Sequence, residues 1–329
     1  MLGTLRLLLA LAVAASHAGL KIGGLNPGVA AVIGFYLISG YVMAGLIRRH
    51  YSQSAQASAF YLDRAVRLLP QYLLYSGLTL AWHWHSQVNM PFLTRSPETG
   101  DLLNNLAVIP LNYYMFNGSD TYTLVPPAWS LGAEIQFYLV APFLLVWPNR
   151  LLTVGVISFC VYAAALSGFI NSDWYGYRLL PGVLLFFVLG AWLQQKHQRH
   201  EYAQSRTTTA IAAVLAVTVL GLFYINGASG QPYKTETLIG LILGIISLQA
   251  LAARPPNRWD TKAGDISYGV FLNHFFIMWT LYPQGVSVTQ LPGFLALCMV
   301  FSGLTQIAVE QPLLKLRHRF RKSPQTLLN

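Results

Sequence analysis

Ten separate stretches of mostly apolar residues run through this chain. Each is long enough to cross a bilayer as a helix, which takes roughly 17–25 residues. In order, they are residues 4–20, 28–47, 68–86, 127–147, 151–170, 178–195, 208–225, 236–253, 266–283 and 292–311. The sequence therefore predicts an all-α integral membrane protein with about ten transmembrane helices in one bundle.

The composition leaves little room for a soluble domain. Hydrophobic residues make up 54% of the chain and charged residues 10%, with a mean hydropathy of +0.47. A typical soluble domain has about 25% charged residues. Cys160 and Cys298 each lie within an apolar stretch, which favours two packed thiols over a disulfide.

The basic residues predict the orientation of the bundle. Net charge is +10, and the Lys and Arg residues cluster in short loops between apolar stretches. With both termini in the cytoplasm, seventeen of the 21 Lys and Arg residues lie inside, and those outside are Lys21, Arg95, Arg178 and Lys234. The positive-inside rule favours this orientation. We expect a transmembrane domain over residues 1–315 and a basic cytoplasmic tail over 316–329, and the loop pattern argues against nucleic-acid binding.

The first apolar stretch carries one Arg and one His. Arg6 and His17 are separated by about three helical turns, so they lie on one face of a helix, roughly 16 Å apart along its axis. Ionisable side chains at membrane depth are costly and usually functional. Two other interpretations fit this stretch alone, a secretory signal peptide and a plain membrane anchor.

Two further arginines stand at the start of the third stretch. Arg64 and Arg67 are three residues apart, so both guanidinium groups can face one anion. Arginine at a cytoplasmic helix end is also ordinary positive-inside content, and spacing alone favours that interpretation.

Glu134 lies inside the fourth stretch, where an unpaired carboxylate is expensive. Ser130, Glu134 and Tyr138 follow an i, i+4 row, which predicts one polar helix face. A structural hydrogen bond between helices is the alternative to a functional role. We favour function, because Glu134 and His17 are expected at similar depth in the outer half of the membrane.

The later stretches hold three more polar residues in apolar surroundings. Asn273 and His274 lie near the middle of the ninth stretch, and we expect an interhelical clamp there more than catalysis by His274. Glu310 is expected to be structural and to pair with a cytoplasmic-side arginine. Gly40 predicts close packing of the second helix, and the aromatic-rich outer connection 87–126 is a candidate lid. We find no His and Cys cluster of metal-ligand spacing.

Several motifs occur in a recognisable order. They are the Arg6–His17 pair, GFYLISGY at 34–41, FYLDRAVRLLPQY at 60–72, PPAWSLGAEIQFYL at 126–139, and later YRLLPGVLLFFVLGAWL, SYGVFLNHFF and VEQPLLKLRHR. Together they resemble the acyltransferase 3 family of bacterial integral-membrane O-acyltransferases, which modify cell-surface glycans and some small molecules. One departure is Ile135, since many members have a second acid after the first. The chain lacks the extracytoplasmic hydrolase-like domain of some relatives, so we expect a stand-alone membrane unit.

The resemblance implies a multi-pass enzyme of the bacterial cytoplasmic (inner) membrane. Its donor would be cytoplasmic acyl-CoA, with acetyl-CoA as the default, acting as a co-substrate rather than a bound cofactor. Its acceptor would be a hydroxyl of a saccharide or lipid-linked glycan, of unspecified identity. Arg6, Arg64 and Arg67 would bind the donor phosphates. No metal is needed, and the oligomeric state is open.

The resemblance also suggests roles near the outer end. His17 would be the general base, with Glu134 holding its tautomer. Arg178 would bind acceptor or stabilise the oxyanion, with Ser130, Tyr138, Asn273 and His274 in support. The outer aromatic loop would stack on a sugar ring. Acylation of His17 itself before transfer stays open.

A transporter or flippase of a small molecule or lipid-linked saccharide is the alternative function. Such proteins also have about ten helices and buried ionisable residues, but they often show two similar halves with broken helices. No such pairing is visible here. Release of free thiol from acyl-CoA distinguishes the two classes.

Overall fold

The computed structural model describes residues 1–198 and 231–313. These residues form helices and contain no β-strand, only isolated bridges. The long helices are α1 (Leu2–His17), α2 (Pro27–His50), α3 (Ala57–Ser86), α6 (Ala128–Leu144), α7 (Pro148–Leu166), α8 (Leu180–Gln198), α10 (Lys234–Ala252), α11 (Arg258–Leu281) and α12 (Leu291–Thr305). The short ones are η1 (Ser54–Gln56), α4 (Thr99–Ala107), η2 (Ile109–Tyr113), α5 (Tyr114–Asn117), η3 (Ser119–Thr121), η4 (Trp174–Arg178) and η6 (Gln306–Glu310).

The all-helical architecture is confirmed for the described residues, and helices cover nine of the ten predicted ranges. The predicted helix over 208–225 and the predicted tail over 316–329 lie outside the described residues. Within the described chain, four helical segments are long and apolar enough to cross a membrane: Pro27–His50, Trp174–Gln198, Lys234–Ala252 and Leu291–Leu313. Two further apolar helices, Leu2–His17 and Arg150–Leu166, are shorter. The number of spans and their orientation stay predictions.

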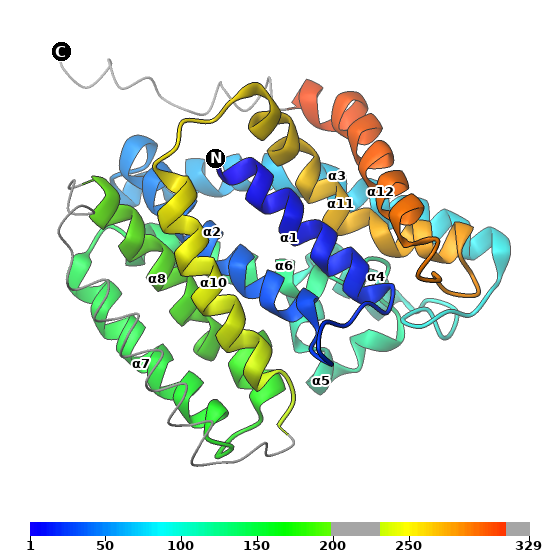
Figure 1. Cartoon of the computed structure of the whole chain (residues 1–329), viewed down its shortest axis with the longest axis horizontal. Coiled ribbons are helices and arrows are strands. Elements are labelled where there is room, and N and C mark those ends of the chain that lie inside the picture. Colours follow the sequence, from blue (N-terminus) through cyan, green and yellow to red (C-terminus); the bar gives the residue numbers. More distant parts are fainter. Residues whose placement is uncertain (199–230, 314–329) are drawn as a thin grey trace.

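Helix α1 lies in the middle of the bundle. Figure 1 shows α2, α8, α10 and α7 on one side of it and α3, α11 and α12 on the other. It runs parallel to α11, because Gly3 contacts Gly264 at one end and His17 contacts His274 at the other. A Cβ on Gly3 would overlap the carbonyl oxygen of Asp260, so glycine permits this close approach. The parallel pairing brings the two histidines to the same end of the bundle.

Glycines also set the contact between α2 and α8. A Cβ on Gly40 would overlap the carbonyl of Phe187, and a Cβ on Gly190 would overlap the carbonyl of Leu37. The two backbones therefore touch, which confirms the close packing predicted at Gly40. This contact fixes the rotation of α2 and turns Ser39, next to Gly40, toward α6.

The connection between α3 and α6 is an ordered cap. Asn105 of α4 donates to the carbonyl oxygens of Asp101 and Tyr122 and accepts from the backbone N–H of Leu124. Tyr122 is completely buried. The predicted aromatic lid is therefore partly wrong, because this aromatic side chain packs into the protein and cannot stack on a ligand.

Candidate active site

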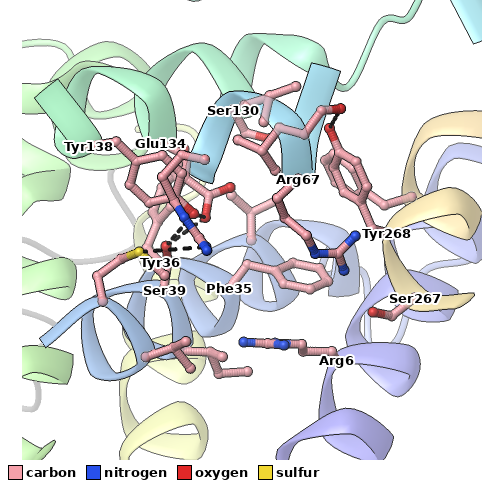
Figure 2. Close-up of a pocket in the computed structure, with 18 residues that line it drawn as sticks. Arg6, Phe35, Tyr36, Ser39, Arg67, Ser130, Glu134, Tyr138, Ser267 and Tyr268 are labelled. Carbon is pink, nitrogen blue, oxygen red and sulfur yellow. Dashed lines mark hydrogen bonds between the residues drawn. The ribbon is translucent and has the colours of Figure 1, made fainter. Parts of the chain in front are cut away.

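A cavity of about 240 Å³ opens between α1, α2, α3, α6 and α11. We call it the arginine cavity, because Arg6 of α1 and Arg64 and Arg67 of α3 line it together with Glu134 of α6. Figure 2 shows Arg6 and Arg67 reaching into it from different helices. The structure therefore brings the three predicted arginines together, although Arg6 is far from the other two in sequence.

Two of these arginines have carboxylate partners. The Nε of Arg64 donates to the Oδ2 of Asp63 over 3.0 Å, and Arg67 pairs with Glu310 of η6. The predicted pairing of Glu310 with an arginine is confirmed. Arg6 has no hydrogen bond or ion pair with any other described residue. Asp63 and Glu310 balance two of the three guanidinium charges, so Arg6 is the cation that the cavity offers most directly to an anion.

Glu134 is held by two hydroxyl groups. Ser39 and Tyr138 each donate to its Oε1 over 2.5 Å, as the dashed lines in Figure 2 show. Ser130 instead donates to the carbonyl of Pro127 over 3.0 Å. Ser130, Glu134 and Tyr138 all line the arginine cavity, so the predicted polar face of this helix exists.

A second, smaller cavity of about 70 Å³ continues toward the other end of α1. We call it the histidine cavity. Its lining includes His17, Trp129, Tyr177 and Arg178. Val32, Ser130 and Phe271 line both cavities. The two cavities therefore adjoin, and they place Arg6 and His17 along one path beside α1.

His17 occupies the last turn of α1, where the chain makes a Schellman cap. The N–H of Gly19 donates to the carbonyl of Ser16 over 3.0 Å, and the N–H of Leu20 donates to that of Ala15 over 2.9 Å. Gly19 has φ +97°, which glycine adopts without strain. The helix therefore ends directly after His17 and leaves its side chain at the rim of the bundle.

His274 of α11 is the hydrogen-bond partner of His17. The Nδ1 of His17 lies 2.9 Å from the Nε2 of His274, whose Nδ1 lies 3.3 Å from the carbonyl oxygen of Val270. A carbonyl only accepts, so the Nδ1 of His274 carries a proton. In neutral His274 the Nε2 then accepts from His17. This arrangement leaves the Nε2 of His17 as the free acceptor.

Arg178 is enclosed by aromatic rings. Its Nε donates to Asp173 over 2.7 Å, and its guanidinium lies 4.4 Å from the ring centre of Trp129 and 5.0 Å from that of Tyr177. Tyr114 packs on the same group at 5.2 Å. Burial raises the pKa of Tyr114 to about 12, so its phenol is neutral. Arg178 is therefore a fixed cation beside His17.

Two predicted placements differ from the structure. The expected contact between Glu134 and His17 is absent from the described hydrogen bonds, because Glu134 lies one helical turn beyond Ser130 and lines only the arginine cavity. Asn273 points toward α12, where it donates to the carbonyl of Cys298 over 3.0 Å. It therefore clamps two helices, as the sequence favoured, and does not line either cavity.

Three contacts of the site are not predictable from the sequence. The second-helix motif predicts close packing at Gly40 but no role for its neighbour Ser39, and neither Asp173 nor Trp129 stands out as a functional residue in the sequence. Asp173 and Arg178 are five residues apart, a spacing that the π-helical turn η4 brings into contact. Trp129 adjoins Ser130 in a motif that was already singled out. Nothing in a single sequence indicated which helix Ser39 would face.

The chain matches a known protein family over most of its length. The model of the acyltransferase domain (Acyl_transf_3) matches residues 2–307. The chain belongs to the acyltransferase 3 family. No solved structure matches it significantly.

Two named relatives of this acyltransferase 3 protein span most of its length. It is 26% identical to the peptidoglycan O-acetyltransferase OatA of Listeria monocytogenes over 97% of this chain, which spans about half (54%) of that protein. It is 27% identical to the exopolysaccharide production protein ExoZ of Rhizobium meliloti, covering 93% of this chain and 96% of that protein. An uncharacterized protein of Aquifex aeolicus is 38% identical over 50% of this chain and 75% of its own length. Family membership therefore makes the protein a membrane acyltransferase rather than a transporter.

Proposed function

We propose that this acyltransferase moves an acyl group, acetyl in the first instance, from acyl-CoA to a hydroxyl of a cell-surface or exported saccharide. The observation that carries the proposal is the pair of adjoining cavities, which lead from three arginines to His17. The names of the two characterised relatives above, a peptidoglycan O-acetyltransferase and an exopolysaccharide production protein, support a saccharide acceptor.

The arginine cavity would hold the phosphates of the donor. Guanidinium groups bind phosphate through paired, charge-assisted hydrogen bonds. Arg6 is free of partners among the described residues, and Arg64 and Arg67 would exchange or share their carboxylate partners. The narrow pantetheine arm would then follow α1 past Val32, Ser130 and Phe271, the residues that both cavities share.

His17 would act as the general base, positioned by His274. Its Nε2 would take the proton of the acceptor hydroxyl, and the acceptor oxygen would form a bond to the acyl carbon. The C–S bond of the thioester would break, and the protonated His17 would return the proton to the leaving CoA thiolate. His274 would take the orienting role that the sequence gave to Glu134.

Arg178 would stabilise the charge that develops in this step. It lines the histidine cavity with His17 and is held by Asp173 and by four aromatic rings, one of them that of Tyr233. A cation fixed beside a developing oxyanion stabilises the transition state more than the ground state. In the cell, the arginine cavity would open toward the cytoplasm of the bacterial inner membrane and His17 would lie near the outer face.

The direct test is acetyl transfer by purified protein in lipid nanodiscs. Wild type is compared with His17→Ala and with His85→Ala, a matched substitution of an exposed histidine at the end of α3. We expect His17→Ala to lower transfer of radiolabelled acetyl from acetyl-CoA to cell-envelope glycans by about 10²–10⁴-fold. His85→Ala should retain wild-type activity. Undiminished transfer by His17→Ala would refute the assignment of the base.

A further inference from the structure

A third hollow lies on the outer side of His17. It is an open groove of about 530 Å³, lined by the end of α1, by α11 and by the connection from α11 to α12. We call it the outer groove. Its described lining includes His17, Gly19, Gln284, Gly285, Ser287 and Gln290.

His17 is the residue that the histidine cavity and the outer groove have in common. Its side chain is exposed, while its partner His274 is completely buried. A hydroxyl in the outer groove can therefore reach the imidazole from one side while a thioester in the histidine cavity reaches it from the other. We infer that the outer groove binds the acceptor, an inference that rests on the proposed transfer reaction.

The chemistry of the groove identifies the class of acceptor segment. Apart from His17, its described lining has no ionisable side chain, so it offers no ion pair to a charged sugar. It offers the amides of Gln284 and Gln290, the hydroxyl of Ser287 and backbone groups, each able to hydrogen-bond a hydroxyl. The apolar side chains of Met278 and Val286 provide a surface for the nonpolar face of a sugar. The segment that is acylated is therefore an uncharged polyhydroxy chain.

The wall of the groove is held in place before any ligand binds. The Oε1 of Gln290 accepts from the N–H of Ser287 over 3.0 Å and from its hydroxyl over 2.9 Å. The N–H of Gly285 donates to the carbonyl of Tyr282 over 2.8 Å. Preformed walls lower the entropic cost of binding.

Two glycines leave the backbone at the rim of the groove uncovered by side chains. Gly19 has φ +97° and Gly285 has φ +90°, and open space surrounds the position that a Cβ would take at each. A ligand can therefore approach the backbone on both sides of His17. Gln284 has no hydrogen bond with the other described residues, so its amide is available to a ligand.

The test fills the groove without touching His17. Gln284→Trp places a bulky ring in it, whereas Val288→Trp adds the same ring to a residue of the same connection that is 87% exposed and does not line the groove. Gln284→Ala serves as a milder variant that keeps the backbone. Each full-length protein is measured for acetyl transfer to cell-envelope glycans and, separately, for binding of acetyl-CoA.

We expect Gln284→Trp to lower transfer by about a hundredfold and Gln284→Ala to raise the KM for the glycan. Both should bind acetyl-CoA like wild type, and Val288→Trp should transfer normally. After digestion, the labelled sugar should be uncharged. Normal transfer by Gln284→Trp, or lost acetyl-CoA binding, would overturn the assignment of the groove, and label on an acidic or phosphorylated sugar would overturn the acceptor class. A wild type without transfer activity would instead refute the proposed function on which the inference rests.

Discussion

At the scale of single residues, the site is defined by what holds each ionisable side chain. His17 is held by His274, and Glu134 is held by Ser39 and Tyr138. These are separate arrangements in adjoining cavities. In the proposed function, His17 would therefore serve the chemistry, while Glu134 would shape the electrostatics of the arginine cavity.

Replacement of His274 should slow the chemical step and leave donor binding intact. In His274→Ala the Nδ1 of His17 loses its acceptor, so its tautomer and orientation are no longer fixed. We expect kcat to fall by about a hundredfold or more, with the KM for acetyl-CoA near that of wild type. Steady-state kinetics with His85→Ala as control measure both values. A raised KM with an unchanged kcat would contradict the positioning role.

Glu134 should matter for stability through its two hydroxyl donors. Glu134→Gln keeps a carbonyl oxygen that can accept from Ser39 and Tyr138. Glu134→Leu leaves both hydroxyls without this acceptor, which we expect to cost about 1–3 kcal/mol of stability. Thermal unfolding in nanodiscs compares the two variants. Equal melting temperatures would show that these hydrogen bonds contribute nothing measurable.

The sequence identified Arg6, His17 and Glu134 because ionisable residues stand out in apolar helices. It placed Tyr138 on the same helix face as Glu134, which the structure confirms, but it did not identify the partner of His17 or the second partner of Glu134. The partner of His17 depends on the parallel packing of α1 and α11, which are distant in the chain. A single sequence carries no information about the relative rotation of two such helices. For the same reason, the contact of Glu134 with Ser39 could not be predicted from the sequence.

At the scale of helices, glycine contacts determine which faces meet. Gly40 and Gly190 bring the backbones of α2 and α8 together, and Gly3 does the same for α1 and α11. In a bilayer, packing of small residues is a main source of attraction between helices. These contacts therefore fix the positions from which Ser39 and His17 reach the site.

A side chain at Gly40 should disrupt the bundle. In Gly40→Val the new Cβ would overlap the backbone of Phe187, which cannot move aside as a side-chain tip can. We expect a loss of about 3 kcal/mol or more and poor accumulation in membranes. Gly77→Val is the matched control, because open space surrounds its Cβ position in α3. Normal stability of Gly40→Val, measured by thermal unfolding, would argue against this contact.

Helix ends show where hydropathy alone is insufficient. Helix α3 begins at Ala57, whereas hydropathy predicted a start at residue 68. The prediction started late because Asp63, Arg64 and Arg67 lower the local hydropathy, although they form ion pairs within the protein. Helix α1 ends at His17 rather than at residue 20, because Gly19 forms the Schellman cap. The start of α3 could not be predicted from the sequence, because the pairing of its charged residues depends on tertiary contacts. The end of α1 could have been predicted, because Gly19 is a recognisable helix-termination signal in the sequence.

At the scale of the whole molecule, the two ends of the bundle differ in chemistry. One end holds the arginine cavity, and the other holds His17, Arg178 and the uncharged outer groove. His17 lies where the path from the first end meets the second. Donor and acceptor would therefore enter from opposite faces and meet at one imidazole.

Arginine substitutions should act only on the phosphate-bearing part of the donor. We expect Arg67→Gln to raise the KM for acetyl-CoA by about tenfold or more, because a charge-assisted contact to phosphate is lost. Acetyl-pantetheine lacks these phosphates, so its transfer should be equal in wild type and variant. The ratio of kcat/KM for the two donors measures the effect. A similar loss with both donors would place Arg67 outside the phosphate site.

Acetyl transfer in vesicles of defined orientation tests most directly whether donor and acceptor reach His17 from opposite faces of the membrane. Radiolabelled acetyl-CoA, which does not cross membranes, is added to inside-out and to right-side-out vesicles that contain wild type or His17→Ala. We predict that glycans become labelled only in inside-out vesicles with wild type, because the arginine cavity then faces the donor. Label in right-side-out vesicles alone, or equal label with His17→Ala, would contradict transfer at His17 between opposite faces.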